Sequence, residues 1–209
     1  VQWLQGEQQL RPSKLGVMQG QQLKLAAKKL ALKGLHNLYN LCIAWELARH
    51  VGLEDEQIAA AAITFEALPH RLQLLPLQGP WFFVNDSIST TPHATIAALE
   101  AFERQIVCLL VGGHDRGLDW QVFVDYLKRH PVHTLITMGE HGRKIKAQVK
   151  AQCDATQMSQ ILWAPDLPQA VRLACAHTPE NAYIILSPGA PSYGEFLSLI
   201  HISEPTRPV

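Results

Sequence analysis

The stretch Ile-Val-Cys-Leu-Leu-Val-Gly-Gly-His-Asp-Arg-Gly occupies residues 106–117. Its first six residues form a continuous apolar run of strand length, and a Gly-Gly pair follows them. Comparable short runs lie at 81–84, 132–138, 161–163 and 182–186, and helical patterns lie between the runs at 92–102, 120–129, 144–151 and 167–176. Strands that alternate with helices predict βαβ crossovers, and therefore an α/β fold with a mostly parallel, covered sheet.

The first third of the chain follows a different pattern. Residues 1–25 mix apolar residues with glycines and predict short strands and turns, whereas 35–51 has helical spacing that Gly52 ends. A second, alanine-rich helix is expected at 55–65. The segment that follows contains Pro69, and the residue before a proline is pushed out of the helical region. We therefore predict a domain boundary near Ala67.

Composition excludes several classes of protein. The chain has 209 residues, 47% hydrophobic and 17% charged, which is typical of globular domains. Lys+Arg and Asp+Glu are both 18, so no net field favours nucleic acid or an anionic membrane. No apolar stretch reaches the roughly 20 residues of a membrane span. Cys42, Cys108 and Cys175 lie in apolar runs, where we expect buried, reduced thiols and hence a cytoplasmic protein.

Ligands of parallel α/β sheets bind beyond the carboxyl ends of the strands. The segment after 81–84 reads Asn-Asp-Ser-Ile-Ser-Thr-Thr-Pro at 85–92. Thr90 or Thr91 can cap a helix that begins at Pro92, and the free N–H groups there can bind an anion. Asp86 could accept hydrogen bonds from a ribose. The alternative is that these side chains only cap the helix.

Two more strand ends carry polar motifs. In the Gly-Gly-His-Asp-Arg-Gly segment the glycines allow close approach of a ligand, and Arg116 can hold a carboxylate with two hydrogen bonds. The alternative is a tight turn with a solvated arginine. In Ser-Pro-Gly-Ala-Pro-Ser-Tyr, at 187–193, Ser192 either presents its hydroxyl to a ligand or belongs to a structural turn. The chain has no G-x-G-x-x-G motif, which disfavours a dinucleotide-dependent oxidoreductase.

Further candidates lie outside the strand ends. Asn37 and Asn40 are one helical turn apart and could contact a nucleobase, or could cap a helix. Arg71 follows the predicted boundary and could reach a phosphate, or could form a surface salt bridge. His130 and His133 do not form a metal pair, because the proline between them breaks the helix that would align the two rings.

The order and spacing of these motifs resemble the Mur ligase family, in particular its glutamate-adding MurD type. The resemblance covers about residues 1–197. It rests on five motifs: G-L-H-N-x-x-N at 34–40, L-P-H-R at 68–71, N-D-S-x-[AS]-T at 85–90, L-L-x-G-G at 109–113 and S-P-x-A-x-S at 187–192.

The resemblance implies a piece of a three-domain, ATP-dependent ligase that joins glutamate to UDP-N-acetylmuramoyl-L-alanine in peptidoglycan synthesis. Residues 1–67 resemble the end of the central ATPase domain, and 68–199 resemble the Rossmann-like C-terminal domain. We expect 200–209 to be a non-native tail. The chain begins at Val1 without an initiator Met, and we expect a cytoplasmic fragment of a monomeric enzyme, with a non-catalytic nucleotide-binding α/β module as the alternative.

The resemblance also assigns site residues. Asn37 and Asn40 match asparagines near the adenine, Arg71 matches an arginine that reaches the nucleotide phosphates, and Asp86 matches an aspartate at the ribose. Four residues match positions that hold the incoming glutamate: Thr90, Arg116, Ser192 and Tyr193. No P-loop motif G-x-x-x-x-G-K-[ST] exists in this chain. The P-loop lysine and the Mg²⁺ ligands are therefore expected upstream, and this chain alone is expected to be inactive and to contain no metal site.

One departure from the family pattern concerns the substrate. Most MurD enzymes have a lysine at the position of Ile88, so one cationic contact is missing here. The motifs at 85–92, 112–120 and 187–192 resemble a subgroup that adds L-glutamate. The residues themselves leave D- and L-glutamate open.

Overall fold

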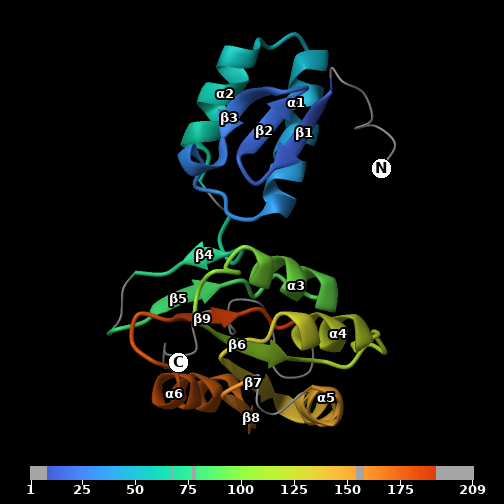
Figure 1. Ribbon diagram of the computed structural model, residues 1–209, viewed down its shortest axis with the longest axis vertical. Coiled ribbons are helices and arrows are strands. Elements are labelled where there is room, and N and C mark those ends of the chain that lie inside the picture. Colours follow the sequence, from blue (N-terminus) through green and yellow to red (C-terminus); the bar gives the residue numbers. More distant parts are fainter. Residues whose placement is uncertain (1–8, 67, 77–78, 154–157, 192–209) are drawn as a thin grey trace, which may run out of the picture. The chain divides into compact units, whose positions relative to one another are not determined.

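A computed structural model describes residues 9–66, 68–76, 79–153 and 158–191. The chain divides between Ala67 and Leu68 into unit 1, residues 1–67, and unit 2, residues 68–209. The two units are described separately, with the element labels of Figure 1.

Unit 1 combines a small antiparallel sheet with two helices. Three strands lie in the order β1-β2-β3, and a short 3-10 helix, Ala27–Lys29, follows them. Apolar side chains from all of these elements except the 3-10 helix form its core, among them Leu10, Val17, Leu25, Trp45 and Ile58. The elements are β1 (Leu10–Ser13), β2 (Gly16–Gln19), β3 (Gln22–Ala26), α1 (Leu35–His50) and α2 (Asp55–Thr64).

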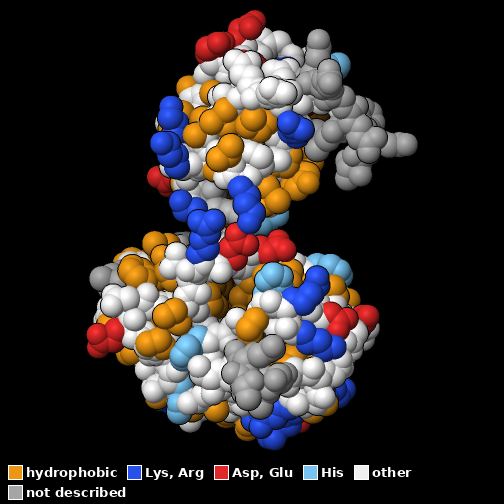
Figure 2. Space-filling view, viewed as in Figure 1, with side chains coloured by type: hydrophobic (Ala, Val, Ile, Leu, Met, Phe, Trp, Pro, Cys, Tyr) orange, Lys and Arg blue, Asp and Glu red, His pale blue; other side chains and the backbone are white. Residues whose placement is uncertain are grey.

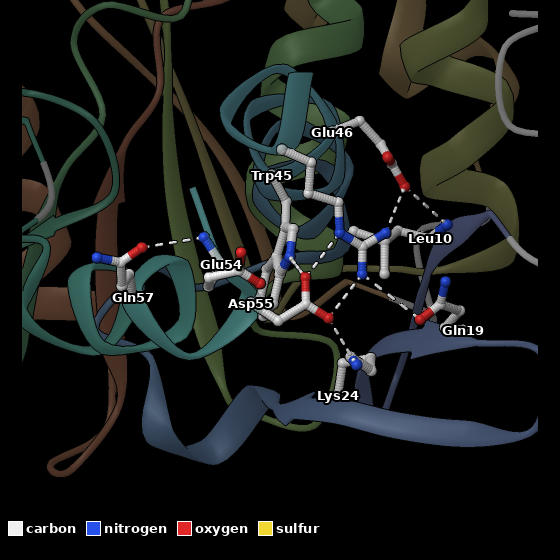
Figure 3. Close-up of polar contacts among 9 residues, drawn as sticks. Leu10, Gln19, Lys24, Trp45, Glu46, Glu54, Asp55 and Gln57 are labelled. Carbon is white, nitrogen blue, oxygen red and sulfur yellow. Dashed lines mark hydrogen bonds and ion pairs between the residues drawn. The ribbon is translucent and has the colours of Figure 1, made fainter. Parts of the chain in front are cut away.

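A carboxylate at the start of α2 ties the sheet of unit 1 to both helices (Figure 3). Asp55 Oδ1 accepts hydrogen bonds from Arg49 Nε at 2.6 Å and from Trp45 Nε1 at 2.9 Å, both on α1. Its Oδ2 lies 2.6 Å from Lys24 Nζ on β3. The hydrogen bond from Arg49, aided by Lys24 and Trp45, holds the pKa of Asp55 well below its usual range.

Unit 2 contains a six-stranded sheet in the order β4-β5-β9-β6-β7-β8. Only the β4–β5 pair is antiparallel. The strands are β4 (Gln73–Leu74), β5 (Phe82–Asn85), β6 (Val107–Gly112), β7 (Thr134–Met138), β8 (Gln160–Ala164) and β9 (Tyr183–Leu186). The helices are α3 (Pro92–Glu100), α4 (Gln121–Arg129), α5 (Gly139–Gln152) and α6 (Leu167–His177).

The helices cover both faces of this sheet, α3, α4 and α5 on one side and α6 on the other (Figure 1). Every residue of the central strands β6 and β7 is buried. The predicted α/β fold with a mostly parallel sheet is therefore confirmed. The apolar run at 106–111 predicted the buried strand β6, which the structure places at Val107–Gly112, because a strand covered on both faces has no polar side to show.

Three expectations need correction. Helix α5 begins at Gly139, not at Lys144. Glycines made its first turns look irregular, yet a Cβ on Gly142 would lie 3.0 Å from the carbonyl carbon of Thr137, so the helix needs glycine to approach β7. Strand β4, only two residues long, was not predicted. Cys175 is only partly buried, whereas Cys153 is buried because it ends α5 against α4.

Both units carry mixed surface charge. In the face that Figure 2 shows, basic and acidic side chains occur on each unit. Among the described residues, no helix is long and apolar enough to cross a membrane.

The substitution Asp55→Asn tests the network of unit 1. Because it removes the charge that Arg49 and Lys24 contact, we expect a loss of about 1–3 kcal/mol in the free energy of unfolding at pH 7. The folded-state pKa is lowered, so this stabilisation is complete above the unfolded-state pKa of about 3.9 and is lost as the pH falls toward the folded-state value. Urea unfolding of both proteins from pH 7 to pH 3 measures the difference.

Glu56→Gln is the matched control, since Glu56 is the next residue on α2 and is exposed. It should change the unfolding free energy little at either pH. A difference between wild type and Asp55→Asn that does not shrink in acid would contradict the assigned role of the Asp55 charge.

Candidate functional site at the carboxyl ends of the strands

Four neighbouring strands, β5, β9, β6 and β7, end at the same edge of the sheet. The last strand, β9, lies between β5 and β6, so the loops that follow three chain-distant strands become neighbours. Such a change of strand order marks the usual ligand crevice of an open α/β sheet. We call the segments 86–91, 113–119 and 187–191 the strand-end loops; β7 is followed directly by helix α5.

The carboxylate of Asp86 is the most buried charged group of these loops, with 3% of the residue exposed. Its Oδ2 accepts hydrogen bonds from Ser89 Oγ at 2.5 Å and from Ser187 Oγ at 2.8 Å. Its Oδ1 accepts one from the Leu72 N–H at 3.1 Å. Asp86 thus joins the loop after β5 to the loop after β9 and to the segment before β4. These bonds within the protein use much of the hydrogen-bond accepting capacity of the carboxylate. The contact of Asp86 with a ribose remains a prediction.

The loop after β9 contacts the loops on both sides of it. Thr95 Oγ1 donates to the Ser187 carbonyl at 3.1 Å, and the Gly189 N–H donates to the Ser89 carbonyl at 2.9 Å. On the β6 side, the His114 N–H donates to the Pro191 carbonyl at 2.7 Å. Gly189 has a φ of +68°, and a Cβ there would lie 2.7 Å from the Trp120 ring. Only glycine fits this close approach without displacing the ring.

The helix entry after β5 has the predicted form. Thr91 is the N-cap of α3, its Oγ1 accepts from the Ala94 N–H at 3.3 Å, and Pro92 occupies the first turn. This confirms that one of the two threonines caps the helix. Thr90 is exposed beside the same helix N-terminus, where the free N–H groups and the helix dipole favour an anion.

Arg116 is exposed in the loop after β6. Its neighbour Asp115 accepts a hydrogen bond from Lys144 Nζ at 2.9 Å and one from the Gly117 N–H at 2.9 Å. Asp115 Oδ2 also lies 3.2 Å from Nδ1 of the buried His141. The Lys144 contact first, with Gly117 and His141, lowers the pKa of Asp115 to about 2, so the loop that carries Arg116 is tied to α5 by an ionised carboxylate.

His141 was not singled out in the sequence. It lies in the first turn of α5, and burial, partly opposed by Asp115, lowers its pKa. Its ring meets the Trp120 ring with the centroids 5.5 Å apart. Burial at a helix N-terminus favours a neutral imidazole. The sequence signal is the Gly-Glu-His-Gly segment at 139–142, which follows β7 directly and therefore also lies at the carboxyl end of a strand.

Arg71 lies just before β4 and is half-buried. Its Nε is buried and has no hydrogen-bond partner among the residues that the structure describes. Buried guanidinium N–H groups normally have partners. The geometry therefore fits an anionic ligand at this side chain.

The remaining candidates are spread over both units. Asn37 on α1 is buried, and its Nδ2 donates a hydrogen bond to the Lys33 carbonyl at 2.7 Å. This is a local bond to the backbone, the kind expected if Asn37 caps the helix and does not contact a nucleobase. Asn40, on the same helix, is exposed. Ser192 and Tyr193 lie outside the described residues. Among the residues described, no group of three or more His, Cys, Asp or Glu could hold a metal ion.

The sequence of this chain resembles those of known proteins. The sequence profile of the Mur ligase glutamate ligase domain matches residues 70–190. A UDP-N-acetylmuramoyl-L-alanine--L-glutamate ligase of Xanthomonas campestris pv. campestris (strain 8004) is 42% identical over 181 residues, 86% of this chain and 38% of that protein. The protein of the same name from Salinispora tropica is 36% identical, over 84% of this chain and 39% of that protein. This chain thus spans about two fifths of the length of these relatives.

Solved structures share the fold. The MurC ligase of Thermotoga maritima superposes with a TM-score of 0.62 at 18% identity, over 88% of this chain and 41% of that one. MurF of Acinetobacter baumannii gives a TM-score of 0.59 at 21% identity, over 77% of this chain and 36% of that one. With the profile matching more than half of its residues, the chain belongs to the Mur ligase family.

Proposed function

We propose that this chain is the C-terminal part of an ATP-dependent ligase that joins L-glutamate to UDP-N-acetylmuramoyl-L-alanine in peptidoglycan synthesis. The observation that carries the proposal is the identity of 36–42% to proteins named for that reaction, over at least 84% of this chain. These names favour the L enantiomer, which the residues alone left open. The strand-end loops lead into a helix N-terminus and carry the cationic side chain of Arg116, both of which suit anionic substrates.

In the proposed reaction, the L-alanine carboxylate attacks the terminal phosphorus of ATP, giving an acyl phosphate and ADP. The glutamate amine then attacks the acyl carbon. A tetrahedral intermediate forms, phosphate leaves with the C–O bond electrons, and the amine loses a proton. Binding groups accelerate both steps by holding the reactants and by stabilising the charge that develops.

We assign Arg71 and Asp86 of unit 2 and, separately, Asn37 and Asn40 of unit 1 to nucleotide binding. In our proposal Arg71 contacts the phosphates, which would give its buried Nε a partner. Asn40, exposed on α1, contacts the adenine, and Asn37 holds the start of that helix. Asp86 supports the nucleotide contact by fixing the Leu72 backbone next to Arg71, since its carboxylate is largely occupied inside the protein.

The glutamate side involves Thr90 and Arg116, together with Ser192 and Tyr193 beyond the described residues. Thr90 stands at the N-terminus of α3 and Arg116 on the loop after β6. A dicarboxylic amino acid suits such a pair, because a guanidinium and free backbone N–H groups each stabilise a carboxylate.

We further propose that unit 1 is the end of the central ATPase domain. Helix α1 packs one face on the small sheet, yet it also carries an exposed apolar stripe at four-residue spacing: Leu35, Tyr39, Ile43 and Leu47, which Val51 continues just after the helix. A helix that is apolar on both faces is normally covered on both. The remaining part of that domain would cover the stripe and would supply the P-loop and the Mg²⁺ ligands, in a cytoplasmic and monomeric enzyme.

Ligation by the full-length enzyme tests the proposal. With UDP-N-acetylmuramoyl-L-alanine, ATP and Mg²⁺, we expect ADP, phosphate and the glutamyl product when L-glutamate is offered, and far less product with D-glutamate. Chromatography of the product and release of phosphate measure this. No product with either enantiomer would refute the function, and product with D-glutamate alone would refute the assigned stereochemistry.

Arg116→Ala in the full-length enzyme tests the glutamate side. We expect the KM for glutamate to rise roughly 10- to 150-fold, because a charged contact contributes about 1.5–3 kcal/mol and each 1.4 kcal/mol is tenfold. The KM for ATP should change little. Arg143→Ala, at a surface arginine that lies over Trp163, is the control and should leave both constants near wild type. Equal rises in both KM values for Arg116→Ala would instead mark Arg116 as structural.

A further inference from the structure

Two motifs that are far apart in the sequence interlock at the start of unit 2. His70 and Leu72 have φ values of +66° and +45°, in the left-handed region that side chains other than glycine rarely adopt. For a leucine this conformation is a true outlier. Such residues persist only where their surroundings hold them, and they concentrate at functional sites.

The loop after β5 supplies most of the groups that hold this backbone. The His70 carbonyl accepts from the Ile88 N–H at 3.3 Å, and the Leu72 N–H donates to Asp86 Oδ1 at 3.1 Å. The His70 N–H donates to Gln73 Oε1 at 3.0 Å. The backbone is therefore fixed on both sides of Arg71.

A hydrogen bond between two side chains also holds this backbone in place. Asn85 Nδ2 lies 3.0 Å from Nδ1 of the His70 ring. The orientation of the Asn85 amide follows from its other end, because Oδ1 accepts from the Ser87 N–H at 3.1 Å. Nδ2 can only donate, so His70 Nδ1 must be the acceptor and the ring proton must lie on Nε2. Asn85 is itself held in β5, opposite Gln73 on one side and Leu186 on the other.

We propose that His70 and Asn85 are positioning residues: their hydrogen bond helps to hold His70 and Leu72, on either side of Arg71, in the left-handed conformation that directs Arg71 toward the nucleotide phosphates. The inference rests on the proposed function of Arg71. A side chain fixed before the substrate arrives loses less conformational freedom in the reactive state. The pair should therefore contribute to kcat more than to the KM for ATP.

Kinetics of the full-length enzyme with three variants tests the coupling. We expect Arg71→Ala to lower kcat at least 10-fold. Asn85→Leu, which has nearly the same shape, should lower kcat roughly 3- to 10-fold, the effect of one hydrogen bond, with the KM for ATP nearly unchanged. In the Arg71→Ala background, Asn85→Leu should have no further effect on kcat, because the side chain that it positions is gone.

Two further variants separate positioning from folding. His70→Asn keeps a residue type that tolerates the left-handed region and removes the ring acceptor, so it should reproduce the kcat loss even if Asn85→Leu folds poorly. Asn181→Ala is the matched control, because Asn181 is also left-handed, with φ +62°, but precedes β9 at the opposite end of the strand. It should lower the melting temperature and leave kcat unchanged.

A readout without catalysis uses the 209-residue chain. Long-range ¹H–¹⁵N spectra should show the His70 proton on Nε2 in wild type and a mixture of tautomers in Asn85→Leu. A proton on Nδ1 in wild type would overturn the inference. A kcat loss from Asn85→Leu that persists in the Arg71→Ala background would also overturn it, while the proposed function stands. A wild-type kcat for Arg71→Ala would instead show that Arg71 does not take part in the reaction. The inference, which rests on that role, would then be overturned as well.

Discussion

The structure of the candidate site depends on one buried charge, the carboxylate of Asp86. Removing a carboxylate from water costs several kcal/mol, and hydrogen bonds from donors placed around it offset that cost. The donors here are a backbone N–H before β4, a serine in the loop after β5 and a serine directly after β9. Because these groups come from three separate parts of the chain, satisfying one carboxylate fixes the geometry of all three parts together.

The segment that carries Arg71 and the loop that carries Arg116 are held in place in different ways. The segment that carries Arg71 is held by hydrogen bonds to the β5 loop, one of them buried, and its strained backbone persists because those bonds hold it on both sides of Arg71. The loop that carries Arg116 is exposed, and the ionised carboxylate of Asp115 ties it to α5 through contacts at the surface. In the proposed ligase, a fixed Arg71 would align the nucleotide phosphates before the second substrate attacks, and a more accessible Arg116 would receive the amino acid.

The sequence predicted the features that depend on neighbouring residues. Local composition predicted a buried strand at 106–111 and an N-cap at Thr90 or Thr91, and the structure has the strand at Val107–Gly112 and the N-cap at Thr91. Strand β4 was missed because two residues form a strand only through pairing with β5. The early start of α5 was missed because Gly142 serves the close approach of the helix to β7. The hydrogen bond between Asp86 and Ser187 joins residues 101 positions apart, and nothing local signals it. The tautomer that we infer for His70 likewise depends on Asn85, which is 15 positions away in the sequence.

Hydrogen exchange at the Leu72 amide tests most directly whether Asp86 holds the site together. In wild type this N–H should be protected, because it donates to a buried carboxylate. In Asp86→Ala it should exchange at least 10-fold faster, since one hydrogen bond to a charged group contributes about 1.5–3 kcal/mol, while the amides of 109–111 in the sheet core stay protected. Unchanged protection of Leu72 in Asp86→Ala, or an equal loss throughout unit 2, would contradict this account.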